Sequence, residues 1–144
     1  RIRQLVYLDS AIAEDGESWS SAHTEQVKAE RRKLAEPSGG VSMPVPKAEV
    51  FGLTDPKDLE WVQRRMTPQP FAPYDQTLHW DGPVGNGLPK LYVDCIQPAY
   101  AGLAPVKQKV RANPNEWPLV ELKTGHDAMV SAPEETAKLL LGFA

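Results

Sequence analysis

The chain has little cysteine, little excess charge and no long hydrophobic run. Its single cysteine, Cys95, excludes an internal disulfide framework. No stretch approaches the ~18 apolar residues of a membrane-spanning helix, and the N-terminus lacks the charged-then-apolar pattern of a secretory signal. The 16 basic residues are outnumbered by 19 acidic ones, whereas a nucleic-acid-binding domain would be clearly basic. We therefore expect a cytoplasmic protein without a nucleic-acid or membrane partner.

What the chain does contain is ordinary for a globular domain, except for proline. The length of 144 residues predicts a single domain. With 41% hydrophobic and 24% charged residues, disorder throughout is not expected. The 14 prolines are about twice the usual share. That excess predicts many loops or an irregular insertion.

The start of the chain indicates a strand that is buried on both faces. Residues 2–9 end in an almost continuous apolar run, which is typical of a strand in a parallel sheet. Such a central strand needs neighbours on both sides, and a domain rarely begins with one. We therefore expect the chain to be the C-terminal part of something larger, with an unusual small fold as the alternative.

The rest of the chain alternates between helical and strand patterns. A last helix is expected to begin with a capping box of Ser131 and Glu134 and to turn Ala137, Leu140 and Leu141 inward. Strands separated by helices predict right-handed crossovers and a parallel sheet, so the fold class is α/β. The other expected elements are strands at 88–96 and 117–123 and helices at 23–36, 54–67 and 105–112.

Polar side chains follow the predicted strands where each one ends. The first strand ends at Asp9, the second near Asp94, and the third is followed by Gly125, His126 and Asp127. Ligands of open α/β sheets bind at the carboxyl ends of the strands. A carboxylate that orients a histidine base is the acid–base half of a nucleophilic triad. The alternative for His126 is an ordinary surface histidine in a loop.

Three stretches resemble the C-terminal half of the α/β-hydrolase superfamily. Residues 5–9, followed by 14–18, are similar to the strand and loop after the nucleophile helix. Residues 67–71 are similar to a cap segment, and residues 124–129 with Pro133 and Glu134 to the catalytic-histidine loop and last helix. The resemblance is to small esterases related to plant methylesterases and hydroxynitrile lyases, and to their bacterial carboxylesterase relatives.

This resemblance implies an α/β-hydrolase parallel sheet of three strands with crossover helices and a mostly helical cap. Residues 1–144 would be the C-terminal half of one domain, with the cap inserted at approximately 17–81. Members carry a Gly-x-Ser-x-Gly nucleophile elbow upstream of the first strand found here, and this sequence has no such motif. The serine nucleophile and the oxyanion donors are therefore expected on a missing N-terminal portion.

The resemblance also bears on which carboxylate orients His126. Plant-type members place the acid a few residues after the second strand, where residues 95–100 hold no carboxylate. Another branch, which includes some haloalkane dehalogenases, places the acid at the end of the preceding strand, and Asp9 matches that position. We therefore expect His126 and Asp9 to be the catalytic residues. The open alternatives are Asp94, Glu14 and Asp15, and Asp127 is expected to make structural hydrogen bonds.

Large apolar side chains of the insertion give a candidate substrate pocket. Their functional interpretation is a mostly apolar pocket above the histidine, and the plain alternative is packing of the cap on the sheet. For Cys95 we expect a small buried hydrophobe. Neither His23 nor His79 has partners at metal-ligand spacing, so no metal site is expected. The expected pocket residues are Trp61, Met66, Phe71 and Trp80 of the insertion, together with Met129 just after the histidine loop.

Together these inferences predict a serine-hydrolase-type carboxylesterase without a metal or organic cofactor. Ester hydrolysis would run through an acyl-enzyme. The chain would be active only when the N-terminal half complements it, either in the same protein or as a second chain. The expected substrate is a small hydrophobic ester, and a homodimer is left open. The alternatives are a non-catalytic relative that binds a small ligand, and a hydroxynitrile lyase, for which Lys123 is the nearby cation.

Overall fold

The computed structural model describes residues 2–143, which divide into two compact units. The first, which we call the sheet unit, comprises the chain up to Ser10, Lys47–Arg65 and the chain from Leu88 onward. The second, the insertion unit, comprises Ala11–Pro46 and Met66–Gly87. No helix within the described residues is both long and apolar enough to cross a bilayer.

The sheet unit is built on three parallel strands, as predicted. The order is β1 (Leu5–Leu8), β4 (Lys90–Cys95) and β5 (Leu119–Leu122). Leu5 pairs with Lys90, and Tyr92 pairs with Leu119. The central strand β4 is buried from its second residue to its last, whereas every residue of β1 is only partly buried. The apolar run at the start of the chain therefore forms an edge strand of this sheet.

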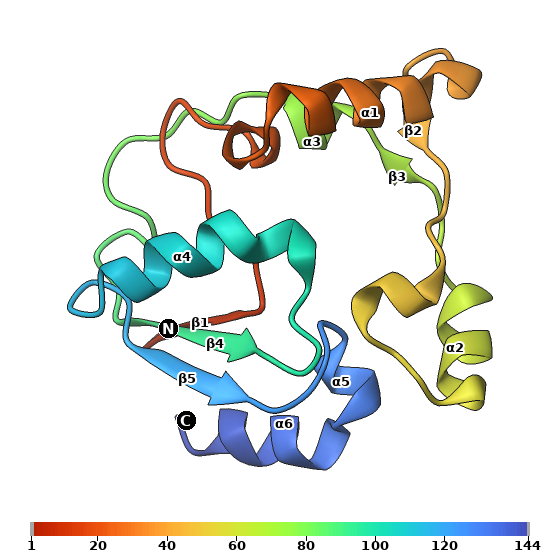
Figure 1. The fold of residues 1–144 in the computed structure, drawn as a ribbon. Helices are drawn as coiled ribbons and strands as arrows, with labels where there is room; N and C mark the ends of the chain where they lie inside the picture. The colour runs from red at the N-terminus through yellow and green to blue at the C-terminus, as the bar shows by residue number, and fades with distance from the viewer. Residues whose placement is uncertain (1, 144) are drawn as a thin grey trace. The chain divides into compact units, whose positions relative to one another are not determined.

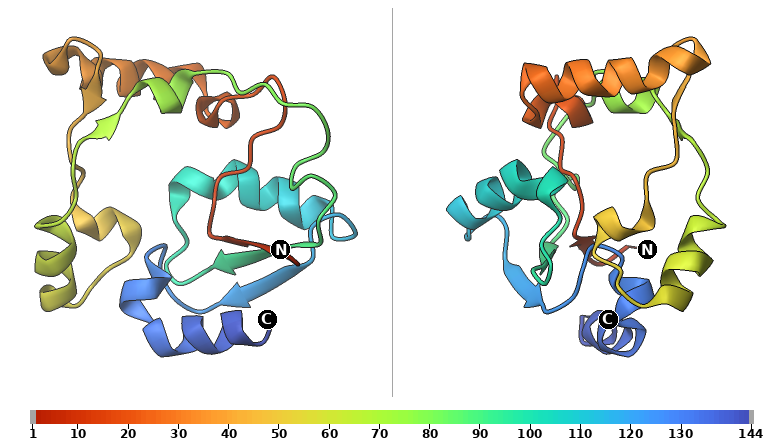
Figure 2. Two further views of the ribbon diagram at one scale, coloured as in Figure 1. Left: turned by 180° about the vertical axis from the view of Figure 1, so that it is seen from behind. Right: turned by 45° about the vertical axis from the view of Figure 1, so that its right-hand side comes forward.

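Helices cover both faces of the sheet (Figure 1). The crossover helix α4 (Ala104–Ala112) lies on one side, and α5 (Ala128–Ser131) and α6 (Pro133–Leu141) follow β5 on the other. The view from behind shows the same layering within this unit (Figure 2). Val106 and Val110 of α4 are buried, so this helix contributes to the core beside β4. The predicted α/β class is confirmed.

The last helix differs from its prediction. Ser131 does not cap it but ends α5, and its hydroxyl lies 2.6 Å from the Thr124 hydroxyl. The capping residue of α6 is Ala132, which makes no side-chain cap, and Pro133 opens the helix. Because the chain turns into a separate short helix at 128–131, the face of α6 is rotated from the one we expected.

The face of α6 that we expected to be buried is in fact exposed. Leu140 and Leu141 are 39% and 75% exposed, and Ala137 is also exposed. The buried residue of this helix is Thr136, whose hydroxyl donates to the Ala128 carbonyl at 3.1 Å.

The insertion unit has a small core of its own. Helix α1 (Glu25–Ala35) is capped by Thr24, which accepts a hydrogen bond from the Val27 amide, and it matches the predicted solvated helix. A short antiparallel pair, β2 (Ser42–Met43) and β3 (Gln69–Pro70), precedes α3 (Ala72–Asp75). The core holds Ala35, Met43 and Tyr74, with Trp19 and Phe71 packed against it.

The middle of the predicted insertion packs with the sheet unit. It consists of a 3-10 helix (Ala48–Phe51) and α2 (Pro56–Gln63), whose first turn is capped by the Asp55 carboxylate. The Gln63 side chain accepts a hydrogen bond from the Ala48 amide at 2.9 Å. Gly52 follows the 3-10 helix with a φ of 84° and approaches Gly125 closely. The segment is therefore tied to the loop that carries His126.

We expect that residues 1–144 expressed alone do not fold cooperatively. Among the described residues β1 pairs only with β4, and its outer edge would leave backbone donors and apolar side chains open. Near-UV circular dichroism should then show no sharp melting transition. A cooperative transition from a species of monomeric mass would contradict this expectation.

Candidate active site

Asp9 sits where β1 ends and the chain turns away from the sheet. Its amide donates to the Val93 carbonyl at 2.8 Å, which continues the pairing of β1 with β4. Its φ is 41°, a value that residues other than glycine rarely adopt. The residue is 1% exposed. Backbone strain of this kind costs about 1–3 kcal/mol and persists only where the surroundings impose it.

His126 lies in the loop between β5 and α5. Its amide donates to the Phe51 carbonyl at 2.9 Å, and the preceding Gly125 packs against the same backbone. A Cβ at Gly125 would lie 2.8 Å from the Phe51 carbonyl oxygen and 3.0 Å from the Gly52 Cα. Only glycine therefore lets the chain pass so close at this point.

The structure brings His126 and Asp9 together across 117 residues of sequence. Nδ1 of His126 lies 2.8 Å from Oδ2 of Asp9. Because an ionised carboxylate only accepts hydrogen bonds, Nδ1 carries the proton and donates it. The imidazole is 26% exposed, whereas the carboxylate is fully buried. This is the contact that the sequence predicted for a base and the carboxylate that orients it.

The other oxygen of Asp9 is also engaged. Oδ1 accepts from the Cys95 amide at 3.1 Å and lies 2.7 Å from Nζ of Lys107. Burial alone would raise the pKa of Asp9, but the hydrogen bond from His126 and the contact with the Lys107 ammonium outweigh it and hold that pKa below its ordinary value. Asp9 is therefore ionised near neutral pH.

Asp94 shares the Lys107 ammonium with Asp9, but its second partner is Arg111 rather than His126. Its oxygens lie 2.8 Å from Nζ of Lys107 and 2.6 Å from the Arg111 guanidinium. Arg111 also contacts Glu121 at 2.7 Å. Asp94 thus belongs to an ion cluster between β4, α4 and β5.

The remaining candidate acids lie elsewhere. Asp15 and Glu14 belong to the insertion unit, where Asp15 accepts from the Trp80 amide at 3.0 Å. Asp127 makes its hydrogen bonds through its backbone carbonyl, which accepts from the amides of Val130 and Ser131. Burial raises the pKa of the Asp127 carboxyl.

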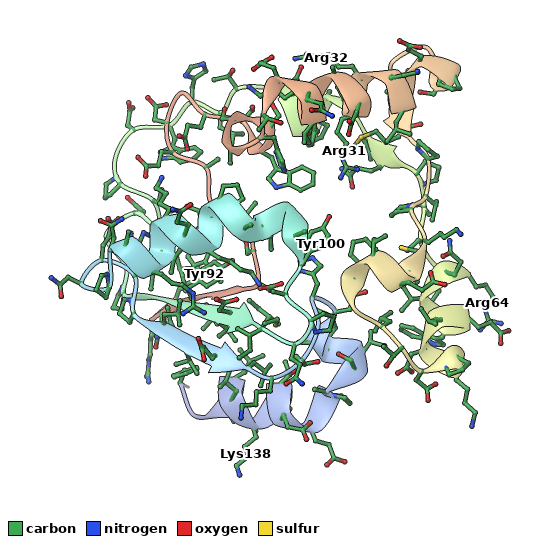
Figure 3. All side chains as sticks on the ribbon, in the orientation of Figure 1. Arg31, Arg32, Arg64, Tyr92, Tyr100 and Lys138 are labelled. Atoms are coloured by element: carbon green, nitrogen blue, oxygen red, sulfur yellow. The ribbon has the colours of Figure 1, made fainter. Side chains whose placement is uncertain are left out.

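Two aromatic side chains that we did not anticipate flank the imidazole. The ring centroid of Tyr100 is 4.7 Å from that of His126, and that of Phe51 is 5.7 Å away. Tyr100 comes from the segment after β4, and Figure 3 labels it beside the N-terminal end of α4. The place of Tyr100 in the loop that follows β4, near the carboxyl end of the strand, was a signal that sequence reasoning could have used. Nothing in the pattern of residues 47–53 pointed to Phe51.

The predicted pocket residues divide between the two units. Phe71 packs on Tyr74, with ring centroids 5.7 Å apart, in the core of the insertion unit. Trp61 is 46% exposed on α2 under the Arg65 guanidinium, and Met129 is 56% exposed on α5. Met66 and Trp80, both in the insertion unit, are partly buried. Their role in a substrate pocket stays a prediction.

Cys95 and the other histidines make no second reactive site. Burial, followed by the negative charge of Asp9, raises the pKa of the Cys95 thiol to about 12. His23 packs against Trp19 and Tyr74, and His79 lies 3.6 Å from Asp15. Within the described residues no group of three or more His, Cys, Asp or Glu side chains could hold a metal ion.

Comparison with known proteins supports the fold that this geometry suggests. No protein-family model matches the chain. The carbendazim hydrolyzing esterase of Nocardioides sp. (strain SG-4G) is 30% identical over 97% of this chain and 60% of its own length. An extracellular α/β-hydrolase from a Paenibacillus species, described as sharing structural and functional homology with tobacco salicylic acid binding protein 2, superposes with a TM-score of 0.80 at 18% identity. That match covers 99% of this chain and 62% of the Paenibacillus protein.

The fold is therefore that of an α/β-hydrolase, and the chain corresponds to the C-terminal part of that fold. Within that class its sequence is related to an esterase, so the resemblance drawn from the sequence is confirmed. The chain spans about three fifths of the length of either relative.

Gly125→Ala should destabilise the complete protein by about 1–3 kcal/mol, the usual cost of overpacking. The added Cβ would meet the backbone of Phe51 and Gly52, and neither can move without shifting the loop that carries His126. Chemical denaturation measures the change, with Lys123→Ala at an exposed position nearby as the control. Equal stability of Gly125→Ala and the unsubstituted protein would show that this approach is not close.

Proposed function

We propose that this chain supplies the general base and its orienting carboxylate to a serine-type carboxylesterase. The observation that carries the proposal is the 2.8 Å contact between Nδ1 of His126 and the buried carboxylate of Asp9. The esterase relative and the α/β-hydrolase neighbour support hydrolysis as the reaction class. The serine nucleophile and the oxyanion donors would come from the N-terminal half, in the same protein or as a second chain.

In the first step His126 accepts a proton from the serine hydroxyl. With Nδ1 donating to Asp9, Nε2 is the nitrogen free to act as a base. The serine oxygen attacks the ester carbonyl carbon, and the imidazolium then returns the proton to the alkoxide that leaves as an alcohol. In the second step water loses its proton to Nε2 and attacks the acyl-enzyme, which releases the carboxylic acid and restores the serine. No metal or organic cofactor takes part.

Asp9 acts by staying ionised while the imidazolium forms. The positive charge that His126 acquires lies beside a buried carboxylate, and an electrostatic contact is stronger there than in water. The Cys95 amide and the Lys107 ammonium hold the second oxygen of this carboxylate. The carboxylate plane is therefore fixed when the proton moves.

The substrate we propose is a small hydrophobic carboxylic ester. Phe51 and Tyr100 give the surroundings of the imidazole an aromatic character, which suits an apolar acyl or aryl group. The Nocardioides relative is named for the hydrolysis of carbendazim. Cyanohydrin cleavage is not favoured, because its cation, Lys123, is exposed at the end of β5 while the His126 ring contacts Asp9, Phe51 and Tyr100. The cytoplasmic location remains a prediction, and the Paenibacillus neighbour is described as extracellular.

His126→Ala should remove nearly all ester hydrolysis by the complete enzyme without unfolding it. The side chain is partly exposed in a loop and buries little apolar surface. In the unsubstituted enzyme, hydrolysis of a short p-nitrophenyl ester should rise with pH on the acid side of its profile, because the base must be unprotonated to accept the serine proton. If the variant keeps more than about a tenth of the rate, far above the usual loss on deleting a triad member, ligand binding without catalysis becomes the better account.

Asp9→Asn should lower kcat by about 10⁴-fold, as amidation of a triad aspartate does. The Cys95 amide and the Lys107 ammonium would hold the asparagine oxygen, so the side-chain NH2 group faces Nδ1. This group donates and cannot accept a hydrogen bond from Nδ1–H, which leaves the imidazole in the wrong tautomer. Asp94→Asn is the matched variant at the neighbouring buried aspartate and should lose far less activity, since Asp94 does not touch His126. The reverse ranking of the two variants would assign the orienting role to Asp94.

A further inference from the structure

Lys107 is a buried lysine directly behind the Asp9–His126 pair. It lies on α4 and is 7% exposed. Its Nζ lies 2.7 Å from Oδ1 of Asp9, 2.8 Å from Oδ1 of Asp94 and 2.7 Å from the Cys95 carbonyl oxygen. The Cys95 carbonyl accepts a hydrogen bond from this ammonium group, and the two carboxylates form ion pairs with it. Lysines are almost never buried unless they are paired in this way.

The charge of Lys107 is maintained in spite of its burial. Burial favours a neutral amine, but the contacts with Asp9 and Asp94 outweigh it, and the pKa of Lys107 lies above its ordinary value. Arg111, the second cation of the cluster, contacts Asp94 and Glu121. Lys107 is therefore the cation that acts on Asp9.

The other titratable groups that face Asp9 come from β4 and from the histidine loop. They are Tyr92, Asp94 and Cys95 on β4, and His126 after β5. Burial raises the pKa of both Tyr92 and Cys95 far above neutrality, and the Tyr92 hydroxyl donates to the Ser10 carbonyl at 2.9 Å. Both are neutral, so Lys107 and Asp94 are the charges beside Asp9, and the neighbouring Asp127 carboxyl interacts electrostatically with His126.

We propose that Lys107 is a positioning residue of the active site: its ammonium holds Oδ1 of Asp9, so that an ionised carboxylate presents Oδ2 to His126. The inference rests on the proposed function for what the pair does. Lys107 would not touch the substrate, because Asp9 stands between it and the imidazole.

Loss of the Lys107 ammonium should raise the pH at which the Asp9–His126 pair takes up a proton. Without the ammonium, the Asp9–His126 pair takes up a proton more readily, whichever of the two members receives it. The active form, with Asp9 ionised and His126 neutral, then needs a higher pH. The Lys107 charge acts on the imidazole across the Asp9 carboxylate. At the effective dielectric constant of about 20 that suits buried sites, its removal should shift the midpoint of proton uptake by the pair on the order of one pH unit.

The experiment compares Lys107→Met with Arg111→Met in the complete hydrolase. Each removes one cation of the same cluster, but only Lys107 touches Asp9. In Lys107→Met the midpoint of the acid side of the pH–kcat profile should rise by about one unit, and kcat at its optimum should fall while KM changes less than about twofold. In Arg111→Met the midpoint should move by less than half as much, since Arg111 is half exposed and screened.

A second readout does not depend on catalysis. The ring-carbon chemical shifts of His126 report proton uptake by the pair, and their midpoint should rise in Lys107→Met by the same amount as in the kinetics. This shift would be seen even if the protein hydrolysed no ester, so failure of the proposed function and failure of this inference are distinguishable. An unchanged or lower midpoint in a folded Lys107→Met protein overturns the inference.

Two further variants cover the case in which Lys107→Met does not fold. Lys107→Arg keeps the charge and should leave the midpoint within a few tenths of a unit. Asp94→Asn keeps an oxygen for Lys107 but removes the negative charge that Lys107 shares, so the midpoint should fall. A midpoint that rises in Asp94→Asn, or is equal in Asp94→Asn and the unsubstituted protein, contradicts the role assigned to Lys107.

Discussion

The buried carboxylate of Asp9 is the group on which the rest of this site depends. Its oxygens are divided among partners from three places in the fold: the Cys95 amide on β4, Lys107 on α4, and His126 after β5. A buried ion is tolerated only when it is paired and hydrogen-bonded. Loss of one partner from such a pair costs about 3–5 kcal/mol. The contacts that orient the imidazole therefore also hold sheet, helix and loop together.

The parallel sheet explains why these partners can meet at all. Its strands all end at one edge, so Asp9 at the end of β1, Cys95 at the end of β4 and His126 after β5 come together although they are far apart in sequence. The positive φ of Asp9 turns the chain away immediately after β1. Strained backbone is commonly found at active sites, where the surrounding contacts impose it. Here the buried hydrogen bonds of the carboxylate are contacts of that kind.

Strand ends made Asp9, Asp94 and His126 candidates in the sequence, and the family resemblance selected Asp9, whereas contacts that depend on close packing were not visible in the sequence. Asp9 and His126 stand at boundaries between apolar runs and polar turns, and such boundaries are visible in a pattern. Lys107 lies in an amphipathic helix, where a lysine is expected to face solvent. Phe51 reaches His126 only because Gly52 and Gly125 let two backbones approach within contact. Ser131 has the spacing of a capping residue, but its hydroxyl bonds to Thr124 instead.

The two charges behind Asp9 must balance for the pair to work as proposed. If Lys107 faced Asp9 alone, its ammonium would cancel the negative charge that an imidazolium needs beside it. Asp94 lies 2.8 Å from the same ammonium and offsets part of its positive charge. The negative charge of Asp9 is therefore less fully cancelled at His126. Two buried carboxylates without the ammonium would repel each other and draw protons at higher pH. Arg111 on the outer side of Asp94 completes the neutralisation without contacting Asp9. How one buried lysine is shared between two aspartates thus bears both on the stability of the cluster and on the negative charge that Asp9 presents to His126.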